Sequence, residues 1–298
     1  MDKTNLKLLR YPGGKQRLLK FLLSYLPNKF EIEGRYIEPF VGGGAVFFAI
    51  NPKRAIISDL NKELIDLYRT LRSRPSKVWK IFEAFPASRQ NYYHIRDLHR
   101  FDTNEGKAAR TLYLNRTCFK GMWRHNARGE FNVGYGGEDR RWAINKESLM
   151  EVSKRLKRTW IRKSDFESVI NKSGPDDFIF LDPPYKPGEV KMSHAHYLHS
   201  QFTLKDHKRL AKSLHKATKR GVKWAMTTSS HPTILELFKK SNIIRVPKGT
   251  SNKLGILTNN SGEVLICNYE RRIKIGHETI FYRGSFTESP PPYSHGFH

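Results

Sequence analysis

The fold is decided by the stretch Tyr36-Ile-Glu-Pro-Phe-Val-Gly-Gly-Gly44, in which a short apolar strand runs into three consecutive glycines. A helix is expected from about Ala45, and Ala55-Ile-Ile-Ser-Asp59 predicts a second strand that ends on an acidic residue. Open α/β sheets bind ligands beyond the carboxyl ends of their strands, and glycines there let a ligand approach the backbone closely. The stretch therefore predicts an α/β fold with a ligand site at that edge of the sheet.

The alternation of strands and helices returns in the second half of the chain. Thr203 followed by Asp206 is typical of the start of a helix, and Gly221 is a suitable residue to end it. Such alternation builds a mostly parallel sheet with helices on both faces. The strands predicted in this half are residues 160–163, 178–182, 222–228, 243–246 and 263–268.

The middle of the chain lacks this rhythm. It is crowded with basic and aromatic residues, which suit a surface that holds phosphates and touches bases. We therefore expect an inserted, mainly helical domain at residues 73–158, ending in a glycine-rich hairpin at residues 119–137. The catalytic domain would consist of residues 1–72 and 159–275, followed by a flexible tail at residues 276–298.

The charge of the chain is strongly unbalanced. It carries 54 Lys and Arg against 28 Asp and Glu, a formal net charge of +26. An excess of this size indicates a polyanionic partner, of which nucleic acid is the commonest. The alternative is a highly soluble or heat-adapted surface, although adaptation usually adds both signs of charge together. The charge alone leaves DNA, RNA and an anionic membrane surface open.

The composition narrows the class of protein further. A chain of 298 residues with 38% apolar residues can bury a sizeable core. No apolar run approaches the roughly 18–20 residues needed to cross a bilayer, and the N-terminus does not resemble a signal peptide. Cys118 and Cys267 lie far apart and match no metal-ligand spacing. We therefore expect no metal and a reducing, cytoplasmic location.

The tetrapeptide Asp182-Pro-Pro-Tyr185 follows a buried strand and carries a specific chemistry. An aromatic amine is a poor nucleophile, because its lone pair is delocalised into the ring. A carboxylate and a stiff prolyl carbonyl that accept its two N–H bonds would push the nitrogen toward tetrahedral geometry, and the tyrosine could stack on the base. Positioning of this kind needs neither a metal nor a covalent nucleophile. The alternative is a chance turn sequence.

The glycine stretch and Asp59 indicate the second reactant. An acidic residue at the end of the second strand can accept both ribose hydroxyls of a nucleoside. The three adjacent glycines differ from the spaced glycines that hold a pyrophosphate, so they favour a smaller nucleoside ligand over a dinucleotide. A purely structural glycine turn is the alternative.

Together these motifs resemble the Dam-type family of site-specific DNA adenine N6-methyltransferases (D12 class, alpha group). The resemblance covers nearly the whole chain except the tail. It is carried, in order, by Tyr11-Pro-Gly-Gly-Lys15, Glu38-Pro-Phe-Val-Gly-Gly-Gly44, Asp59, Leu112-Tyr-Leu-Asn-Arg116, Gly121-Met-Trp-Arg-His-Asn126, Gly129-Glu-Phe-Asn-Val133 and Asp182-Pro-Pro-Tyr185.

The resemblance implies a Rossmann-like methyltransferase sheet with an inserted target-recognition domain. It also implies that S-adenosyl-L-methionine donates a methyl group to N6 of a flipped adenine in double-stranded DNA. By the same resemblance, the catalytic residues are Asp182, Pro183, Pro184 and Tyr185. The implied cofactor-binding residues are Tyr11, Lys15, Glu38, Phe40, Gly42, Gly44, Asp59, Asp165, Phe166 and Asp182.

The resemblance further implies that the hairpin enters the duplex. Arg124 would read a base edge in the major groove or, alternatively, contact a phosphate. Met122 would wedge near the space left by the flipped adenine. The residues expected to contact DNA are Arg10, Arg116, Lys120, Met122, Arg124 and Asn126.

Three positions depart from the family pattern. Lys120 stands where many relatives carry Asn, Gly134 replaces a common Pro, and Glu138 falls near a position that is often aromatic in GATC-methylating relatives. The target site is therefore left open between a short palindrome such as GATC and a longer site such as GATATC.

Several alternatives stay open on the sequence alone. The chain could methylate adenine in RNA, or be an inactive DNA-binding homologue. Methylation of cytosine N4 is disfavoured, because such enzymes usually begin the tetrapeptide with Ser where this chain has Asp182. A cognate restriction endonuclease, a solitary regulatory role and a bacterial or phage origin all fit the pattern, and the oligomeric state is undetermined.

Overall fold

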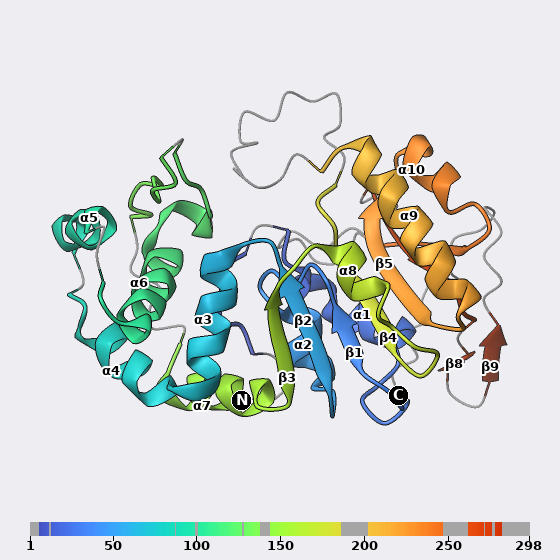
Figure 1. The fold of residues 1–298 in the computed structure, drawn as a ribbon, viewed down its shortest axis with the longest axis horizontal. Coiled ribbons are helices and arrows are strands. Elements are labelled where there is room, and N and C mark those ends of the chain that lie inside the picture. Colours follow the sequence, from blue (N-terminus) through green and yellow to red (C-terminus); the bar gives the residue numbers. More distant parts are fainter. Residues whose placement is uncertain are drawn as a thin grey trace, which may run out of the picture.

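A seven-stranded sheet forms the centre of the computed structural model, in the order β3-β2-β1-β4-β5-β7-β6 (Figure 1). The structure describes residues 6–11, 13–86, 88–98, 101–126, 128–137, 144–185, 202–246, 262–270, 272–275 and 278–281. The strands of the sheet are β1 (Tyr36–Glu38), β2 (Ala55–Asp59), β3 (Thr159–Lys163), β4 (Phe178–Leu181), β5 (Lys223–Ser229), β6 (Asn242–Arg245) and β7 (Glu263–Cys267).

The pairing of the strands agrees with the predicted sheet. β3, β2, β1, β4 and β5 pair in parallel, whereas β7 runs antiparallel to both of its neighbours, β5 and β6. The central strands read as continuous apolar runs because helices cover both of their faces. In β4, Phe180 packs into the core on one face, while Ile179 and Leu181 pack into the core on the other.

Helices from the two halves of the chain cover the two faces. α1 (Leu19–Tyr25), which follows a short 3₁₀ turn at Lys15–Leu18, contributes to one core together with α2 (Ala45–Ile50) and α3 (Lys62–Ser73). The opposite core is built with α8 (Phe166–Ile170), α9 (Leu204–Lys219) and α10 (Pro232–Leu237). The predicted α/β fold is confirmed.

The predicted start of α9 is confirmed in detail. The Thr203 hydroxyl accepts a bond from the Asp206 amide at 3.4 Å, and the Asp206 carboxylate accepts one from the Thr203 amide at 2.9 Å. These reciprocal bonds satisfy amides that have no partner within the helix. Gly221, with φ at +83°, lies just after the helix, as predicted.

The middle of the chain forms helices at the side of α3 (Figure 1). They are α4 (Pro75–Ala84), α5 (Arg89–Asp97), α6 (Asn104–Thr117) and α7 (Lys146–Leu156). Their buried residues join the same core as α1, α2 and α3. Because the inserted helices share this core, the structure does not separate them as a domain, and the boundaries at residues 73 and 158 remain a prediction.

The segment from 119 to 137 is a hairpin without regular strands. A 3₁₀ turn at Phe119–Gly121 opens it, and two isolated antiparallel bridges, Cys118 with Tyr135 and His125 with Phe131, hold its arms together. Backbone bonds also join the arms, from the Phe119 amide to the Gly134 carbonyl and from the Asn126 amide to the Glu130 carbonyl, both at 2.9 Å, and side-chain bonds of Arg124 and Asn126 add to them.

A short pair of strands spans the predicted start of the tail. β8 (Arg272–Ile275) pairs antiparallel with β9 (Glu278–Phe281), so a strand lies where the flexible tail was expected to begin. The pairing is local, and it crosses the boundary drawn between 275 and 276. The rest of the predicted tail, like Pro12 and Glu138, lies outside the described residues. In the part of the chain that is described, no helix has the length and apolar character to span a membrane.

Candidate active site

Four polar side chains meet at the carboxyl edge of the sheet. Glu38 ends β1, Asp59 ends β2, Asp182 follows β4, and Thr227 lies near the end of β5. The four strands are parallel neighbours, so their carboxyl ends lie at the same edge. The two motifs that were predicted to carry the chemistry are therefore brought to one place.

Asp182 is held through one of its two carboxylate oxygens. Its Oδ1 lies 2.9 Å from the Nζ of Lys15 and accepts hydrogen bonds from the hydroxyls of Thr227 at 2.7 Å and Tyr185 at 3.4 Å. Among the residues that the structure describes, none donates a hydrogen bond to Oδ2. The side chain is thus fixed in orientation while one oxygen can accept a further N–H.

Lys15 joins the N-terminal motif to the tetrapeptide. It is only 5% exposed, and its ammonium also donates to the Gly13 carbonyl at 2.9 Å. The same ammonium lies 5.0 Å from the centre of the Tyr185 ring and 3.9 Å from a carboxylate oxygen of Glu263. These partners offset the loss of hydration that burial imposes on the lysine side chain.

The edge of the sheet is acidic and poorly hydrated. The pKa of Glu38 is raised to about 8, chiefly by burial and also by the nearby carboxylates of Asp182 and Asp59, while a 2.7 Å bond from the Tyr36 hydroxyl opposes the rise. Burial also raises the pKa of Asp182, while Lys15 and Thr227 oppose the rise. Near neutral pH Glu38 is largely protonated, so the carboxylates of Asp59 and Asp182 beside the Lys15 ammonium make a site that favours a positively charged ligand.

The glycine turn leaves no room for side chains. Gly42 and Gly44 have φ values of +44° and +67°, where residues with a Cβ are strained. A Cβ on Gly42 would lie 3.0 Å from the Tyr11 ring, which packs over the turn. The amide of Gly42 donates to Asp59 at 3.1 Å, and its carbonyl accepts from the Tyr68 hydroxyl at 2.8 Å. Tyr11, the glycines and Asp59 thus form one rigid unit.

Asp165 and Phe166 lie just beyond β3, next to the end of β2. Asp165 caps α8 by accepting from the Glu167 amide at 2.9 Å, and its other oxygen lies 2.5 Å from the Arg209 guanidinium. Phe166 is buried and stacks on Phe40, with ring centres 5.5 Å apart. Both carboxylate oxygens of Asp165 therefore have protein partners, a feature the sequence did not indicate.

For Arg116 the structure argues against the expected DNA contact. Its side chain is buried, and its guanidinium donates to the carbonyls of Leu8, at 2.7 and 3.0 Å, and of Lys7. These bonds attach the N-terminal segment to the last turn of α6. A DNA-binding role for Arg116 is thus corrected to a structural one.

Asn126 is also occupied within the protein. Its side-chain oxygen accepts from the amides of Arg128 and Glu130, both at 3.0 Å, and its amide donates to the Glu130 carboxylate at 2.8 Å. These bonds close the turn of the hairpin. Asn126 therefore shapes the hairpin, and the structure gives no support for the expected contact with DNA.

The other expected DNA-binding residues lie at or near the surface. Arg124 donates to the side chain and the carbonyl of Asn132, at 2.8 and 3.1 Å. Lys120 is exposed and has φ at +53°, a conformation that Asn adopts more easily than Lys. Met122 is half-buried, and Arg10 is bonded through its backbone to Asn115 at 2.8 Å.

Sequence reasoning missed three residues at these sites. Thr227 supports Asp182, Arg209 pairs with Asp165, and His125 of the hairpin lies 3.0 Å from Glu63 on α3. A polar residue inside an apolar strand was a usable indication for Thr227. The two charged pairs join distant parts of the chain, so no local pattern indicates them.

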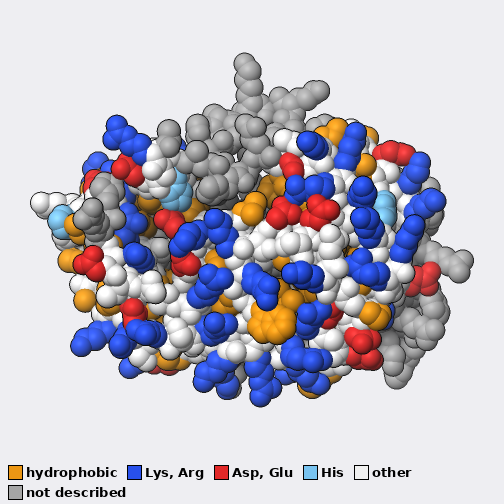
Figure 2. Space-filling view, viewed as in Figure 1, with side chains coloured by type: hydrophobic (Ala, Val, Ile, Leu, Met, Phe, Trp, Pro, Cys, Tyr) orange, Lys and Arg blue, Asp and Glu red, His pale blue; other side chains and the backbone are white. Residues whose placement is uncertain are grey.

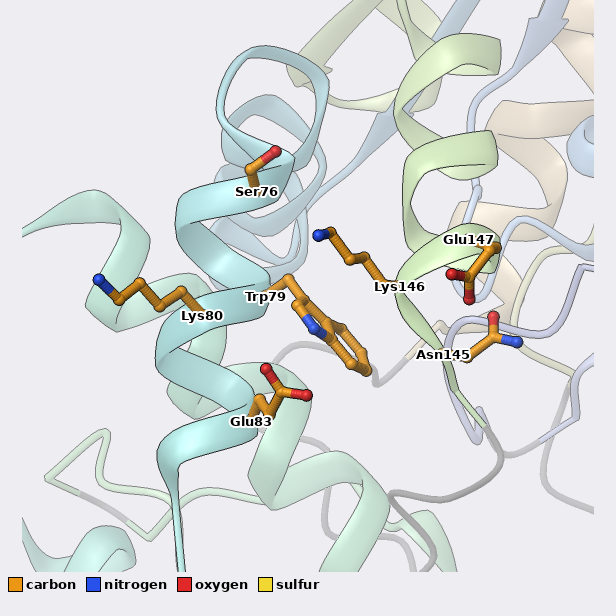
Figure 3. A pocket seen from close by; sticks show the side chains of 7 residues that line it. All are labelled: Ser76, Trp79, Lys80, Glu83, Asn145, Lys146 and Glu147. Carbon is orange, nitrogen blue, oxygen red and sulfur yellow. The ribbon is translucent and has the colours of Figure 1, made fainter.

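The described part of the chain also contains a cavity of about 600 Å³ between α4 and the start of α7 (Figure 3). The Trp79 side chain projects from α4 toward α7 there. None of the predicted site residues lines it, so the cavity is separate from the carboxyl edge of the sheet. Its lining consists of Ser76, Trp79, Lys80, Glu83, Asn145, Lys146 and Glu147.

Comparison with known proteins identifies relatives along most of the chain. Type II methyltransferase M1.LlaDCHI of Lactococcus lactis is 30% identical over 282 residues, which cover 90% of this chain and 97% of the relative. Type II methyltransferase M.MjaIII of Methanocaldococcus jannaschii is 34% identical, covering 88% and 98%. The DNA adenine methylase of Escherichia coli is 27% identical, covering 85% and 92%.

The family model of the D12 class of N6 adenine-specific DNA methyltransferases matches residues 11–251. That span contains the Lys15–Asp182 pair, the glycine turn and the hairpin, so the match and the geometry concern the same residues. The chain therefore belongs to the D12 class of N6 adenine-specific DNA methyltransferases and is a site-specific, adenine-specific DNA methyltransferase.

Proposed function

We propose that this enzyme transfers a methyl group from S-adenosyl-L-methionine to N6 of a flipped adenine in double-stranded DNA, within a short palindrome such as GATC. The observation that carries the proposal is the way in which the Asp182 carboxylate is held. One oxygen is fixed by Lys15 and Thr227, and the other is left for a substrate N–H.

The acidic edge of the sheet fits the proposed cofactor. S-adenosyl-L-methionine carries a sulfonium and an ammonium group, and the carboxylates of Asp59 and Asp182 would supply compensating negative charge, whereas Glu38, with a pKa of about 8, would keep its proton near neutral pH. The glycine turn lets the Tyr11 ring pack closely over it, which would hold Tyr11 beside Asp59 where the cofactor is proposed to bind. The remaining residues proposed to hold the cofactor are Lys15, Phe40, Gly42, Gly44, Asp165 and Phe166.

Asp165 would contact the adenine ring of the cofactor, as the family resemblance implies. Each carboxylate oxygen has two acceptor positions, so Asp165 can take a further N–H while it caps α8 and pairs with Arg209. Asp59 has the same capacity toward the ribose hydroxyls, beside its bonds from the amides of Gly42 and Asn61.

The chemistry follows from the tetrapeptide. The bound cofactor supplies a methyl group made electrophilic by its positive sulfur. Asp182 Oδ2 and the Pro183 carbonyl accept the two N–H bonds of the target amine, and Tyr185 stacks on the base. Held in this way, the amine lone pair would point toward that methyl group, and the Asp182 carboxylate, which would already accept one of the N–H bonds, would take the proton that the amine loses.

The hairpin is proposed to recognise the target. Arg124 presents a planar fork of donors suited to a guanine edge or a phosphate, and Met122 lies two residues before it. Because Arg124 bonds to Asn132 in the free protein, DNA binding would exchange these bonds for bonds to DNA. Lys120 and Arg10 would contact the backbone nearby.

Electrostatics support duplex DNA as the partner. Lys and Arg side chains spread across the face shown in Figure 2, with few acidic side chains between them. The net charge of +26 matches a substrate with two charges per base pair. The type II relatives also support a proposed cytoplasmic restriction system with a cognate endonuclease as partner.

Nucleoside mass spectrometry tests the proposal. The protein is incubated with S-adenosyl-L-methionine and with duplex DNA or RNA of mixed sequence, and the digested nucleosides are analysed. We expect N6-methyladenine in DNA alone. Methylated RNA, N4-methylcytosine or an unmodified product would each overturn the proposed function. Sequencing of the methylated positions then gives the target site.

A further inference from the structure

The hairpin and the cofactor edge of the sheet are joined by one charged hydrogen bond. The Nε2 of His125 lies 3.0 Å from Oε2 of Glu63, and the nitrogen must donate because an ionised carboxylate only accepts. The His125 side chain is 14% exposed and that of Glu63 is 41% exposed. The bond is thus partly shielded from water, where such contacts are stronger than at an open surface.

Glu63 is tied closely to the proposed ribose-binding residue. Asn61, two residues earlier, donates its amide to Asp59 at 2.9 Å and caps α3 by accepting from Leu64 at 3.2 Å. Glu63 lies in the first turn of that helix. A displacement of Glu63 would therefore move the cap and the Asp59 side chain with it.

His125 is tied equally closely to the proposed recognition residue. It bridges to Phe131 across the hairpin, and its ring lies edge-on to the Phe131 ring at 5.8 Å. Its neighbour Arg124 is fixed by two hydrogen bonds to Asn132, which follows Phe131 on the opposite arm. The position of His125 therefore sets the position of Arg124.

The hairpin also contacts the N-terminal segment. Trp123 packs near Tyr11, which covers the glycine turn, with ring centres 6.1 Å apart, and the Cys118 carbonyl accepts from Arg10 at 3.3 Å. Both contacts join the hairpin to the N-terminal segment. The Glu63–His125 bond joins it to the first turn of the helix that follows β2 and Asp59.

We infer that Glu63 and His125 form a positioning pair that couples target recognition by the hairpin to cofactor binding at Asp59. The inference rests on the proposed function, because it assigns the two ends to DNA and to S-adenosyl-L-methionine. Each ligand orders one end of the pair, so each binds more tightly when the other is present. Coupling of this kind is reciprocal.

Binding measurements with both ligands test the pair. The affinity for S-adenosyl-L-methionine is measured by calorimetry without DNA and with saturating duplex carrying the mapped target site. The ratio of the two dissociation constants is the coupling factor. The variants are His125→Ala, Glu63→Ala, the double variant, and His125→Gln, whose amide can replace the Nε2 donor.

We expect the wild-type coupling factor to be about 5 or more and to fall by about half or more in both alanine variants, with the Trp123–Tyr11 contact retaining the rest. The double variant should lose no more than either single one, and His125→Gln should retain most of the coupling. The affinity of each variant for S-adenosyl-L-methionine without DNA should stay within about 2-fold of the wild-type affinity. Glu63 also acts electrostatically on Arg110. If Glu63→Ala lowered the coupling through Arg110, the double variant would lose more coupling than His125→Ala alone.

Asp66→Ala is the matched control, since it removes an ion pair with Lys62 on the same helix that reaches neither site. Unchanged coupling in folded His125→Ala protein would overturn the inference, as would equal losses in His125→Ala and Asp66→Ala. If an alanine variant fails to fold, Glu63→Gln keeps the shape and should still lower the coupling. Wild-type protein that methylates DNA but shows no coupling would contradict only this inference, whereas absent methylation contradicts the proposed function.

Discussion

Asp182 and its three donors are the centre of the site at the residue scale. The sequence motif indicated Asp182 and Tyr185, and the resemblance indicated Lys15. Thr227 belongs to no motif; its polarity within an apolar strand was a usable indication, but it does not by itself distinguish a functional hydroxyl from a structural one. Arg116 was wrongly assigned for a similar reason: the covering segment at Lys7 and Leu8 is visible only in the fold.

Thr227→Val tests the support of Asp182. The substitution keeps the shape but removes the 2.7 Å bond, which lowers the Asp182 pKa. We expect kcat to fall by about 10-fold or more, because a bond to a charged group is lost. The acid limb of the pH–rate profile should move to higher pH. Thr228→Val removes a buried hydroxyl without a partner among the described residues, so it should leave kcat and the acid limb of the pH–rate profile unchanged.

Glu38→Gln tests the buried carboxyl group. The pKa of Glu38 is raised from 4.5 to about 8, so the folded state holds this proton more tightly than the unfolded state. The resulting stability is present below pH 4.5 and is lost as the pH rises toward 8. Relative to the variant, the wild type should lose up to about 1.4 kcal/mol per pH unit across that window. Parallel Tm curves for the two proteins would show that the group is not buried.

Regular elements were the most predictable part of the structure. The strands and α9 follow from apolar runs and a capping pattern that act locally, and their ends agree within a few residues. The hairpin was expected from its glycines, but its form depends on side chains such as Asn126 and Arg124 bonding within it. The pairing of β8 with β9 was missed, because the boundary was drawn from composition at the end of the chain.

The glycine turn gives a prediction at the element scale. Gly42→Ala places a Cβ at a φ of +44° and 3.0 Å from the Tyr11 ring. We expect unfolding free energy to fall by about 1–3 kcal/mol and cofactor affinity to fall with it. Gly129→Ala is the control, because it has φ at +79° but no atom within 4 Å of the new Cβ. Urea unfolding and calorimetry should show a loss of stability in both variants, but a loss of cofactor binding only in Gly42→Ala.

The whole molecule is a strongly basic enzyme built on one acidic site. Its charge was fully readable from composition, whereas the gathering of Glu38, Asp59 and Asp182 at one edge needed the strand order. The contrast separates the two ligands: the surface attracts a polyanion, and the edge of the sheet attracts a cation. Long-range attraction and local chemistry are thus placed on different parts of the protein.

The basic surface predicts a steep dependence of DNA affinity on salt. Neutralised phosphates release counterions, so affinity for a duplex should fall by about 100-fold or more between roughly 50 and 200 mM salt. Affinity for S-adenosyl-L-methionine, measured without DNA, should change far less. Fluorescence anisotropy with a labelled duplex measures the first and calorimetry the second. A flat response for the duplex would show that the charge does not serve DNA binding.

The most direct test of the account is the single-turnover rate of methyl transfer in Asp182→Asn, with cofactor and target duplex both saturating. Asparagine keeps the size of the side chain but replaces an acceptor oxygen by a donor that cannot grip the target amine. We predict a fall of about 100-fold or more in the rate, with both dissociation constants within a few-fold of wild type. A rate within about 10-fold of wild type, or a rate loss matched by lost binding, would contradict the assigned role of Asp182.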